Sequence, residues 1–256
     1  MKFMTFASGS GGNSALVWNG DTRLLIDAGI SATRITQALA ALGMKPAELS
    51  AVLVTHGHTD HTAGLPILLK RTSANVWASG GTASEICKKC PEGRLTAVAP
   101  GAELRFGSMR VRGFETPHDS AGSMGFVVSE EGGASLAFVT DLGRVTAEVR
   151  RAALGVRAAV LESNHDFDML RDGPYPWPLK RRIGSDFGHL SNEAAGEFAR
   201  ELAEAGAKCL LLAHLSETNN TPEAARRAVA AALGSALDGL TLSVAPAGEC
   251  SGIFEV

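Results

Sequence analysis

The sequence predicts an α/β fold in which two β-sheets pack together and helices cover their outer faces, a four-layer αβ/βα sandwich. Short apolar runs rich in Val, Leu, Ile and Phe recur along the chain and are typical of buried strands. Segments with the apolar spacing of helices lie between the later runs. With 256 residues, 45% of them hydrophobic, and no low-complexity linker, we expect a single domain over residues 1–256.

Strands cluster early in the chain and alternate with helices later. The predicted strands are residues 2–6, 14–18, 22–27, 51–55, 109–115, 124–129, 134–139, 158–162, 208–214 and 239–244. The predicted helices are residues 31–42, 60–71, 82–89, 146–154, 192–205 and 222–233. Thr221, Pro222 and Glu223 have the N-cap, first-turn proline and acid that begin a helix. Residues 172–178 contain three prolines, so we expect a shaped loop there instead of a helix or central strand.

The composition indicates no dominant electrostatic partner, because 24 basic and 27 acidic residues give a net charge of -3. No secretory signal begins the chain, and no apolar run approaches the roughly 20 residues of a membrane-spanning helix. Four cysteines in such a chain predict free thiols and a cytoplasmic location. Cys87 and Cys90 have the spacing of a zinc or redox pair, but no second pair accompanies them, so an ordinary helix position is the favoured interpretation.

A cluster of metal-ligand residues follows the predicted strand over residues 51–55. His56, His58, Asp60 and His61 fall within six residues, on the turn that leads into a predicted helix. Imidazole and carboxylate groups suit zinc, manganese or iron, and one tight turn directs them toward common points. A solvated loop with surface histidines is the alternative, but so dense a cluster is rare by chance.

Three further candidates each follow an apolar strand: His118, Asp141 and His214. Polar groups at that depth need partners. Taken singly, each has an ordinary alternative, a satisfied buried histidine or a turn aspartate. Taken with the first cluster, they predict a shared metal site.

The pattern HxHxDH followed by a lone His, Asp and His at strand ends resembles the metallo-β-lactamase superfamily. The resemblance implies that family's sandwich fold and two divalent metal ions, zinc or manganese, with iron as a further option. It implies that Asp27 orients a ligand without binding metal. By the same resemblance, one metal is held by His56, His58 and His118, the other by Asp60, His61 and His214, and both by Asp141.

Two ions about 3.5 to 4 Å apart can share a hydroxide as nucleophile and clamp the attacked group. Asp60 would orient that hydroxide and could take its proton, whereas the leaving group needs an acid from outside the metal shell. No ligand position carries a cysteine, and Asp141 is present. In this respect the ligand set resembles the glyoxalase, ribonuclease and phosphodiesterase branches more than the antibiotic-degrading members.

Three stretches narrow the resemblance to one branch of the superfamily: residues 8–14, 162–166 and 188–192. With residues 175–183 and 214–220, they resemble the YycJ/WalJ branch of the superfamily, whose members are exonucleases acting on DNA. This implies phosphodiester hydrolysis with DNA as the substrate, 5′ to 3′ on double strands. The RNA-processing branches carry an inserted cap domain, and a chain of 256 residues has no room for one. Substrate would therefore reach the metals through an open groove shaped by residues 172–178.

Residues near these motifs are the candidate substrate contacts. His189 precedes a predicted helix N-terminus, which favours phosphate, so it is the candidate general acid or phosphate clamp, with a structural loop histidine as the alternative. Arg182 belongs to a short basic run that could neutralise phosphates or simply face solvent. Ser10 and Asn13 lie in a Gly-rich turn that could bind an anion or be a plain hairpin turn. Asn164 and His165 directly follow the strand over residues 158–162 and could contact substrate or buttress ligands, and Ser191 and Asn192 are further candidate substrate contacts.

Two other functions remain open from the residues. A glyoxalase-II-like thioesterase would use the same ligands, but such enzymes append a helical region, whereas this chain ends in predicted strands over residues 240–244 and 253–256. A metal-binding regulatory protein of the same fold could lack turnover, although the intact ligand set and His189 favour an enzyme. Oligomeric state is not indicated by the sequence.

Overall fold

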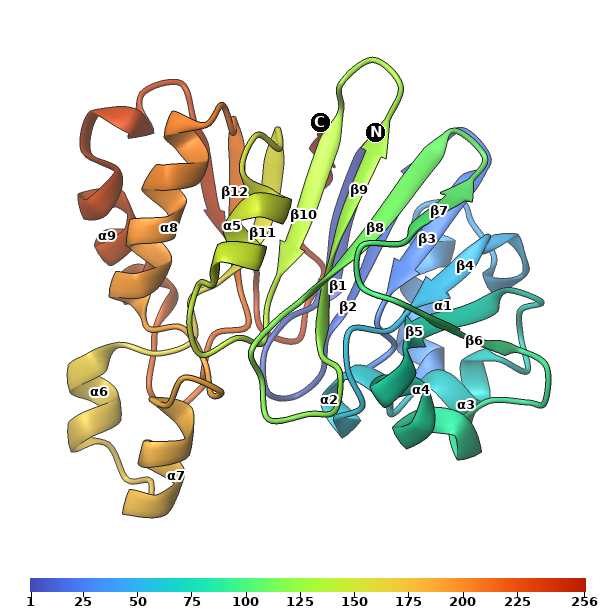
Figure 1. The fold of residues 1–256 in the computed structure, drawn as a ribbon, viewed down its shortest axis with the longest axis horizontal. Helices are drawn as coiled ribbons and strands as arrows, with labels where there is room; N and C mark the ends of the chain where they lie inside the picture. Colours follow the sequence, from blue (N-terminus) through green and yellow to red (C-terminus); the bar gives the residue numbers. More distant parts are fainter.

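The computed structural model describes residues 1–256 and contains two seven-stranded sheets (Figure 1). The first sheet has the order β14-β1-β2-β3-β4-β5-β6. Its strands are β1 (Lys2–Ala7), β2 (Ser14–Asn19), β3 (Thr22–Ile26), β4 (Ala51–Leu53), β5 (Asn75–Ser79), β6 (Leu95–Val98) and β14 (Phe254–Glu255). The second sheet has the order β13-β12-β11-β10-β9-β8-β7. Its strands are β7 (Glu103–Phe106), β8 (Met109–Glu115), β9 (Met124–Glu130), β10 (Ser135–Val139), β11 (Ala158–Glu162), β12 (Cys209–Ala213) and β13 (Thr241–Val244).

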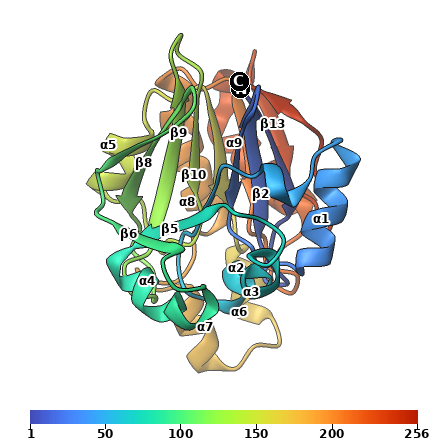
Figure 2. The ribbon, with the colours of Figure 1, turned by 90° about the vertical axis from the view of Figure 1, so that its right-hand side faces the viewer.

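Alternation along the strands builds three apolar layers between four layers of structure. In β3, Leu24 and Ile26 pack between the sheets, whereas Leu25 packs toward helices α1 (Ala32–Ala41) and α3 (Leu65–Leu68). In β12, Leu211 packs between the sheets, whereas its neighbours face α8 (Asn192–Glu204) and α9 (Pro222–Leu233). Helices α4 (Gly80–Ile86) and α5 (Ala147–Ala153) complete the outer layers (Figure 2). The predicted four-layer sandwich is confirmed.

One predicted helix is divided in the structure, and three strands of the structure were not predicted. The helix predicted over 60–71 is split into α2 (Thr59–Thr62) and α3. Gly64 lies at the break, where its N–H donates to the Ala28 carbonyl 2.8 Å away and a Cβ would lie 2.0 Å from the Ile30 carbonyl oxygen. Strands β5, β6 and β7 were not predicted; all three are short, and β6 and β7 are only partly buried.

The proline-containing tract does not form the loop that we expected throughout residues 172–178. Helix α6 (Phe167–Asp172) ends at its start, and helix α7 (Trp177–Ile183) begins inside it. Pro176 is the N-cap residue of α7, and Pro178 lies in its first turn, where the missing N–H would have no helical partner. Both helices project from the body of the sandwich (Figure 1).

None of the helices combines the length and apolar character needed to cross a membrane.

Candidate metal centre

The candidate ligands lie in loops at the carboxyl ends of strands from both sheets. Strands β3 and β4 run parallel in the first sheet, and β10, β11 and β12 run parallel in the second, so their following loops gather at one end of the sandwich. Asp27, Asp141 and His214 each come directly after or two residues after a strand and have positive φ values of 60°, 59° and 57°. They are the only residues other than glycine with positive φ, a conformation that costs about 1 to 3 kcal/mol. The strain is concentrated at this end of the fold.

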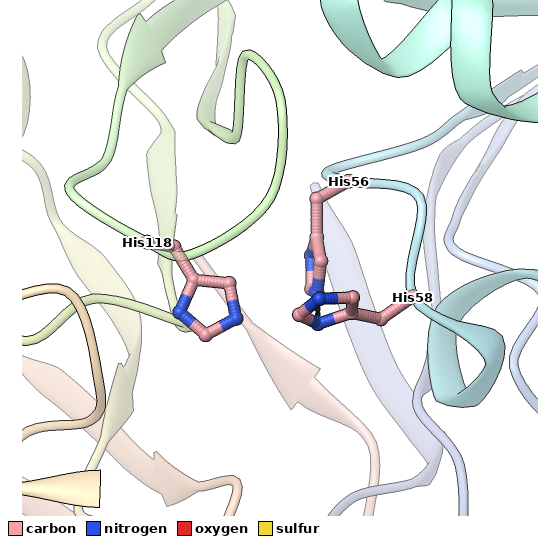
Figure 3. A group of neighbouring side chains, drawn as sticks. All are labelled: His56, His58 and His118. Carbon is pink, nitrogen blue, oxygen red and sulfur yellow. Dashed lines mark hydrogen bonds between the residues drawn. The ribbon is translucent and has the colours of Figure 1, made fainter. Parts of the chain in front are cut away.

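The first ligand group contains His56, His58 and His118 (Figure 3). His56 and His58 lie on the loop after β4, and His118 lies on the loop after β8. The Nε2 atom of His56 is 3.0 Å from Nδ1 of His58, and one nitrogen from each of the three rings lies within 4.8 Å of the others. His56 is fully buried and His58 is partly exposed, so the group opens toward solvent on one side.

The second ligand group contains Asp60, His61 and His214. Oδ2 of Asp60 is 3.5 Å from Nε2 of His61 and 3.7 Å from Nε2 of His214. Asp141 is buried between the two groups: its Oδ2 is 3.4 Å from Nε2 of His61, and its Oδ1 is 3.9 Å from Nε2 of His118. The structure therefore brings together all seven ligand candidates of the sequence.

Hydrogen bonds at Nδ1 orient three of the histidines. His61 Nδ1 is 2.8 Å from Oδ2 of Asp27, His118 Nδ1 is 3.1 Å from the Gly188 carbonyl oxygen, and His214 Nδ1 is 2.8 Å from Oε1 of Glu162. An acceptor at Nδ1 leaves Nε2 with a free lone pair, which is the arrangement of metal-binding histidines.

Three buried atoms facing this space have no hydrogen-bond partner: Nε2 of His118, Nε2 of His214 and Oδ2 of Asp141. Buried polar atoms are nearly always paired, so an unpaired set that converges fits a missing cation. The nitrogen and oxygen donors suit a divalent metal. On these observations the residues fit divalent metal binding.

The charges of the site also favour a cation. Burial raises the pKa of Asp141, but His214 and His61 outweigh burial and hold that pKa well below its usual range. Burial lowers the pKa of His214, but Asp141, Asp60 and Glu162 outweigh burial and raise that pKa to about 10. The carboxylates are therefore ionised, and they raise the pKa of His61 and His214, whereas burial lowers the pKa of His56 and His118.

Glu162, to which the sequence analysis assigned no role, connects two histidines of the site. It ends β11 and is fully buried, and its Oε1 lies 2.8 Å from Nδ1 of both His189 and His214. Its Oε2 accepts from the backbone N–H groups of Leu142 and Leu190 at 3.0 and 3.3 Å. The signal that could have found it is a lone carboxylate at the end of an otherwise apolar strand, AAVLE.

An open cleft of about 440 Å³ leads to the ligands. Ser10, Arg182 and His189 line it together with Asp60 and Asp141. The side chain of His189 is 16% exposed and its Nδ1 is oriented by Glu162, so a candidate proton donor lies beside the ligands and can reach the cleft.

The Gly-rich turn supports the ligand loop. Asn13 Nδ2 lies 3.0 Å from Nε2 of His61 and 3.4 Å from Oδ2 of Asp60, and the Asn13 N–H donates to the Asp60 carbonyl at 2.7 Å. Gly29 must be glycine here, because a Cβ would lie 1.6 Å from the same carbonyl oxygen. Asn13 thus contacts ligands, whereas Ser10 faces the cleft.

Four predicted substrate contacts are placed outside the cleft. Asn164 Nδ2 donates to the His214 carbonyl at 2.8 Å. Asn164 therefore supports a ligand residue, which is the second of the two roles left open from the sequence. His165 is buried, and its carbonyl accepts from the Asn192 N–H. Asn192 Oδ1 accepts from the Ser163 hydroxyl at 2.6 Å, and Ser191 caps α8 by accepting from the Ala194 N–H at 3.2 Å. Two of the first amides of α8, those of Asn192 and Ala194, are therefore already hydrogen-bonded within the protein.

Cys87 and Cys90 belong to none of the groups that could hold a metal ion, and both are free thiols on the turn that follows α4.

Known proteins resemble this chain in both sequence and fold. The family model described as "Beta-lactamase superfamily domain" matches residues 22–215. The chain is 38% identical over 241 residues to the exodeoxyribonuclease YycJ of Bacillus anthracis, covering 91% of this chain and 89% of that protein. It is 33% identical over 229 residues to the exodeoxyribonuclease WalJ of Streptococcus pneumoniae, covering 88% and 85%. Among solved structures, the metallo-β-lactamase-fold protein YhfI from Bacillus subtilis matches with a TM-score of 0.77 at 18% identity, covering 98% of both chains.

Proposed function

This chain belongs to the β-lactamase superfamily and to the family of the exodeoxyribonucleases YycJ and WalJ, and on that premise we propose that it is a metal-dependent exonuclease that hydrolyses phosphodiester bonds of DNA. The observation that carries the proposal is the convergence of seven ligand residues beside His189, at the base of an open cleft. The resemblance stated from the sequence is confirmed by these comparisons.

The proposed cofactors are two divalent ions. His56, His58 and His118 would hold one, Asp60, His61 and His214 would hold the other, and Asp141 would contact both. Zinc and manganese both suit these nitrogen and oxygen donors, and iron is a further option. When bound, such ions supply an activated water and Lewis-acid stabilisation of the phosphoryl group.

The residues of the chain would divide the proton transfers. Asp60, whose pKa is held far below its usual range by His214 and His61 despite burial, is an ionised acceptor at the nucleophile side. His189 would donate a proton to the leaving oxygen. Glu162 fixes the His189 ring through Nδ1, which leaves Nε2 as the atom that can transfer the proton.

Ser10 and Arg182 are the proposed substrate contacts, since both line the cleft. Asp119 holds the Arg182 guanidinium through Nε and one terminal nitrogen, so the other terminal nitrogen would be the donor to a phosphate. We propose a cytoplasmic location, since the four cysteines are free thiols and DNA is the proposed substrate.

A substrate panel tests the proposal. Purified protein loaded with zinc or manganese should degrade linear DNA carrying a 5′-phosphate faster than 3′-phosphorylated DNA or RNA, and should hydrolyse bis(p-nitrophenyl) phosphate. Intact DNA and phosphodiester alongside hydrolysis of S-acyl glutathione would establish the thioesterase alternative instead. Bound metal without turnover of any of these would establish the non-catalytic alternative.

A further inference from the structure

Exposed aromatic side chains are concentrated in one segment of the surface. Six large hydrophobic side chains are exposed, and the three aromatic ones, Phe167, Trp177 and Phe187, all lie within residues 167–187. They are 61%, 67% and 56% exposed. Large aromatic rings contribute most when they are covered, so such a group marks a binding surface more often than a solvated one.

Helix α7 combines its aromatic ring with unopposed positive charge. Trp177, Lys180 and Arg181 are three and four residues apart, so they share one face of the helix. Lys180 Nζ donates to the Arg171 backbone carbonyl at 2.7 Å, and neither Lys180 nor Arg181 makes an ion pair. The helix contains three cations and no acid.

Helix α6 has the opposite character, although it also exposes an aromatic ring. The Arg171 guanidinium pairs with Asp168 at 2.6 Å and with Asp172 at 2.7 Å, and it lies 6.0 Å from the Phe167 ring. The single cation of α6 is therefore neutralised, and an anionic polymer has no reason to bind there. Phe167 is a matched control for Trp177.

The cationic helix borders the metal site. Arg182, the next residue of α7, pairs with Asp119 through Nε at 2.5 Å and a terminal nitrogen at 3.1 Å, and Asp119 directly follows the ligand His118. Phe187 lines a second cavity of about 530 Å³ that also contacts His118. Helix α7 projects beyond the sandwich on the side of α2, which carries Asp60 and His61 (Figures 1 and 2).

We propose that Trp177, Arg181 and Phe187 form a rim that binds unpaired nucleotides at the end of the DNA substrate. Aromatic rings beside cations bind single strands because bases stack on the rings while the cations contact phosphates. Paired bases inside a duplex do not offer their faces, so the rim selects an overhanging or frayed end and leads it to the cleft. This inference rests on the proposed nuclease function and specifies the form of its substrate.

Direct binding tests the rim independently of cleavage. Trp18 is buried and Trp77 is partly buried, so Trp177 is the exposed fluorophore of the three tryptophans. Phosphorothioate oligothymidylate should quench the fluorescence of the metal-loaded protein by stacking on Trp177. By anisotropy, Trp177→Ala and Phe187→Ala should each weaken binding about 5- to 100-fold, the loss of one stacked base, and Trp177→Phe should restore part of it. Phe167→Ala should bind as the wild type does.

Cleavage assays then distinguish a loss of DNA-end binding at the rim from a loss of hydrolysis at the metal site. Trp177→Ala should lower kcat/KM for a duplex with a single-stranded overhang at least tenfold more than for bis(p-nitrophenyl) phosphate, and the wild type should prefer the overhang to a blunt end. If the wild type cleaves DNA but Trp177→Ala and Phe187→Ala match it in binding and cleavage, the rim is refuted and the nuclease function stands. An equal loss in Phe167→Ala also refutes the rim. Failure of the wild type on both DNA and the small phosphodiester refutes the nuclease function itself.

Discussion

The two halves of the sandwich contribute to the site in different ways. The first half supplies His56, His58, Asp60 and His61 from one loop after β4, within six residues of chain. The second half supplies one residue from each of several strand ends: His118, Asp141, Glu162 and His214. The compact loop is held by Asn13 and Asp27 of the same half, whereas the distributed set depends on the register of β8, β10, β11 and β12. Perturbing the distributed set should therefore disturb the whole centre, and perturbing a supporting contact of the compact loop should have a local effect.

The largest effect is expected at Asp141, because it lies between the two ligand groups. Asp141→Ala should abolish DNA hydrolysis, by about a thousandfold or more, and lower the metal content, measured by elemental analysis of the dialysed protein. Asp238→Ala, an exposed aspartate without an ion pair, is the control. Full metal content together with normal turnover in Asp141→Ala would contradict the assignment.

His189 tests whether the second half also supplies the proton. His189→Ala should lower turnover about 10²- to 10⁴-fold with metal content retained, because we propose that His189 is the proton donor. His189 also lies with Asp141, Glu162 and His214 in a further group that could hold a metal ion, so the metal content of the variant decides between the two roles. Glu162→Gln should lower turnover and also loosen metal, since Glu162 contacts His214 as well as His189. Metal loss in His189→Ala equal to that in Glu162→Gln would show that His189 is a ligand or a structural residue.

Asp27 tests the compact loop through its support. Asp27 Oδ1 accepts from the Thr55 N–H and its Oδ2 lies 2.8 Å from both the Thr55 hydroxyl oxygen and His61 Nδ1. Asp27→Asn should weaken metal binding about 10- to 100-fold, the usual effect of losing an orienting acceptor. Competition with a chromophoric chelator measures it, and a change confined to one of two binding steps would locate the effect at the His61 side.

The smallest expected effect is the pH dependence of metal binding. In the metal-free protein the pKa of His214 is raised to about 10, so the ring is protonated at pH 7 and must lose that proton to bind metal. Metal affinity should therefore rise with pH, about tenfold per unit for each proton released. Affinities measured at pH 6, 7 and 8 in chelator-buffered solution, with proton release on metal binding followed by calorimetry in two buffers, check the sign. An affinity independent of pH would contradict the protonated state.

The residues of the rim, unlike the metal ligands, could not be identified from the sequence. What distinguishes them is the exposure of their side chains, which only the structure shows. Trp177 and Phe167 look alike in the sequence, as aromatic residues near short helices. Their surroundings differ through ion pairs: Arg171 is neutralised by Asp168 and Asp172, and Arg181 is not paired. Pairing of this kind depends on side-chain geometry that residue spacing does not specify.

The sequence by itself determined the layered fold and the ligand set, because both depend on short-range patterns. Strand periodicity specifies which side chains are buried, and a ligand that directly follows a strand is carried to the strand's end wherever that strand lies. Only the tertiary structure decided what surrounds the ligands. Glu162 joins His189 to His214, and Asn192 and Asn164 are directed inward by partners 28 and 50 residues away. Gly64 breaks the helix predicted over 60–71 for the same reason, since its amide bonds to Ala28 on another loop. Hydrogen bonds between distant segments form after packing has brought those segments together, and local spacing therefore does not encode them.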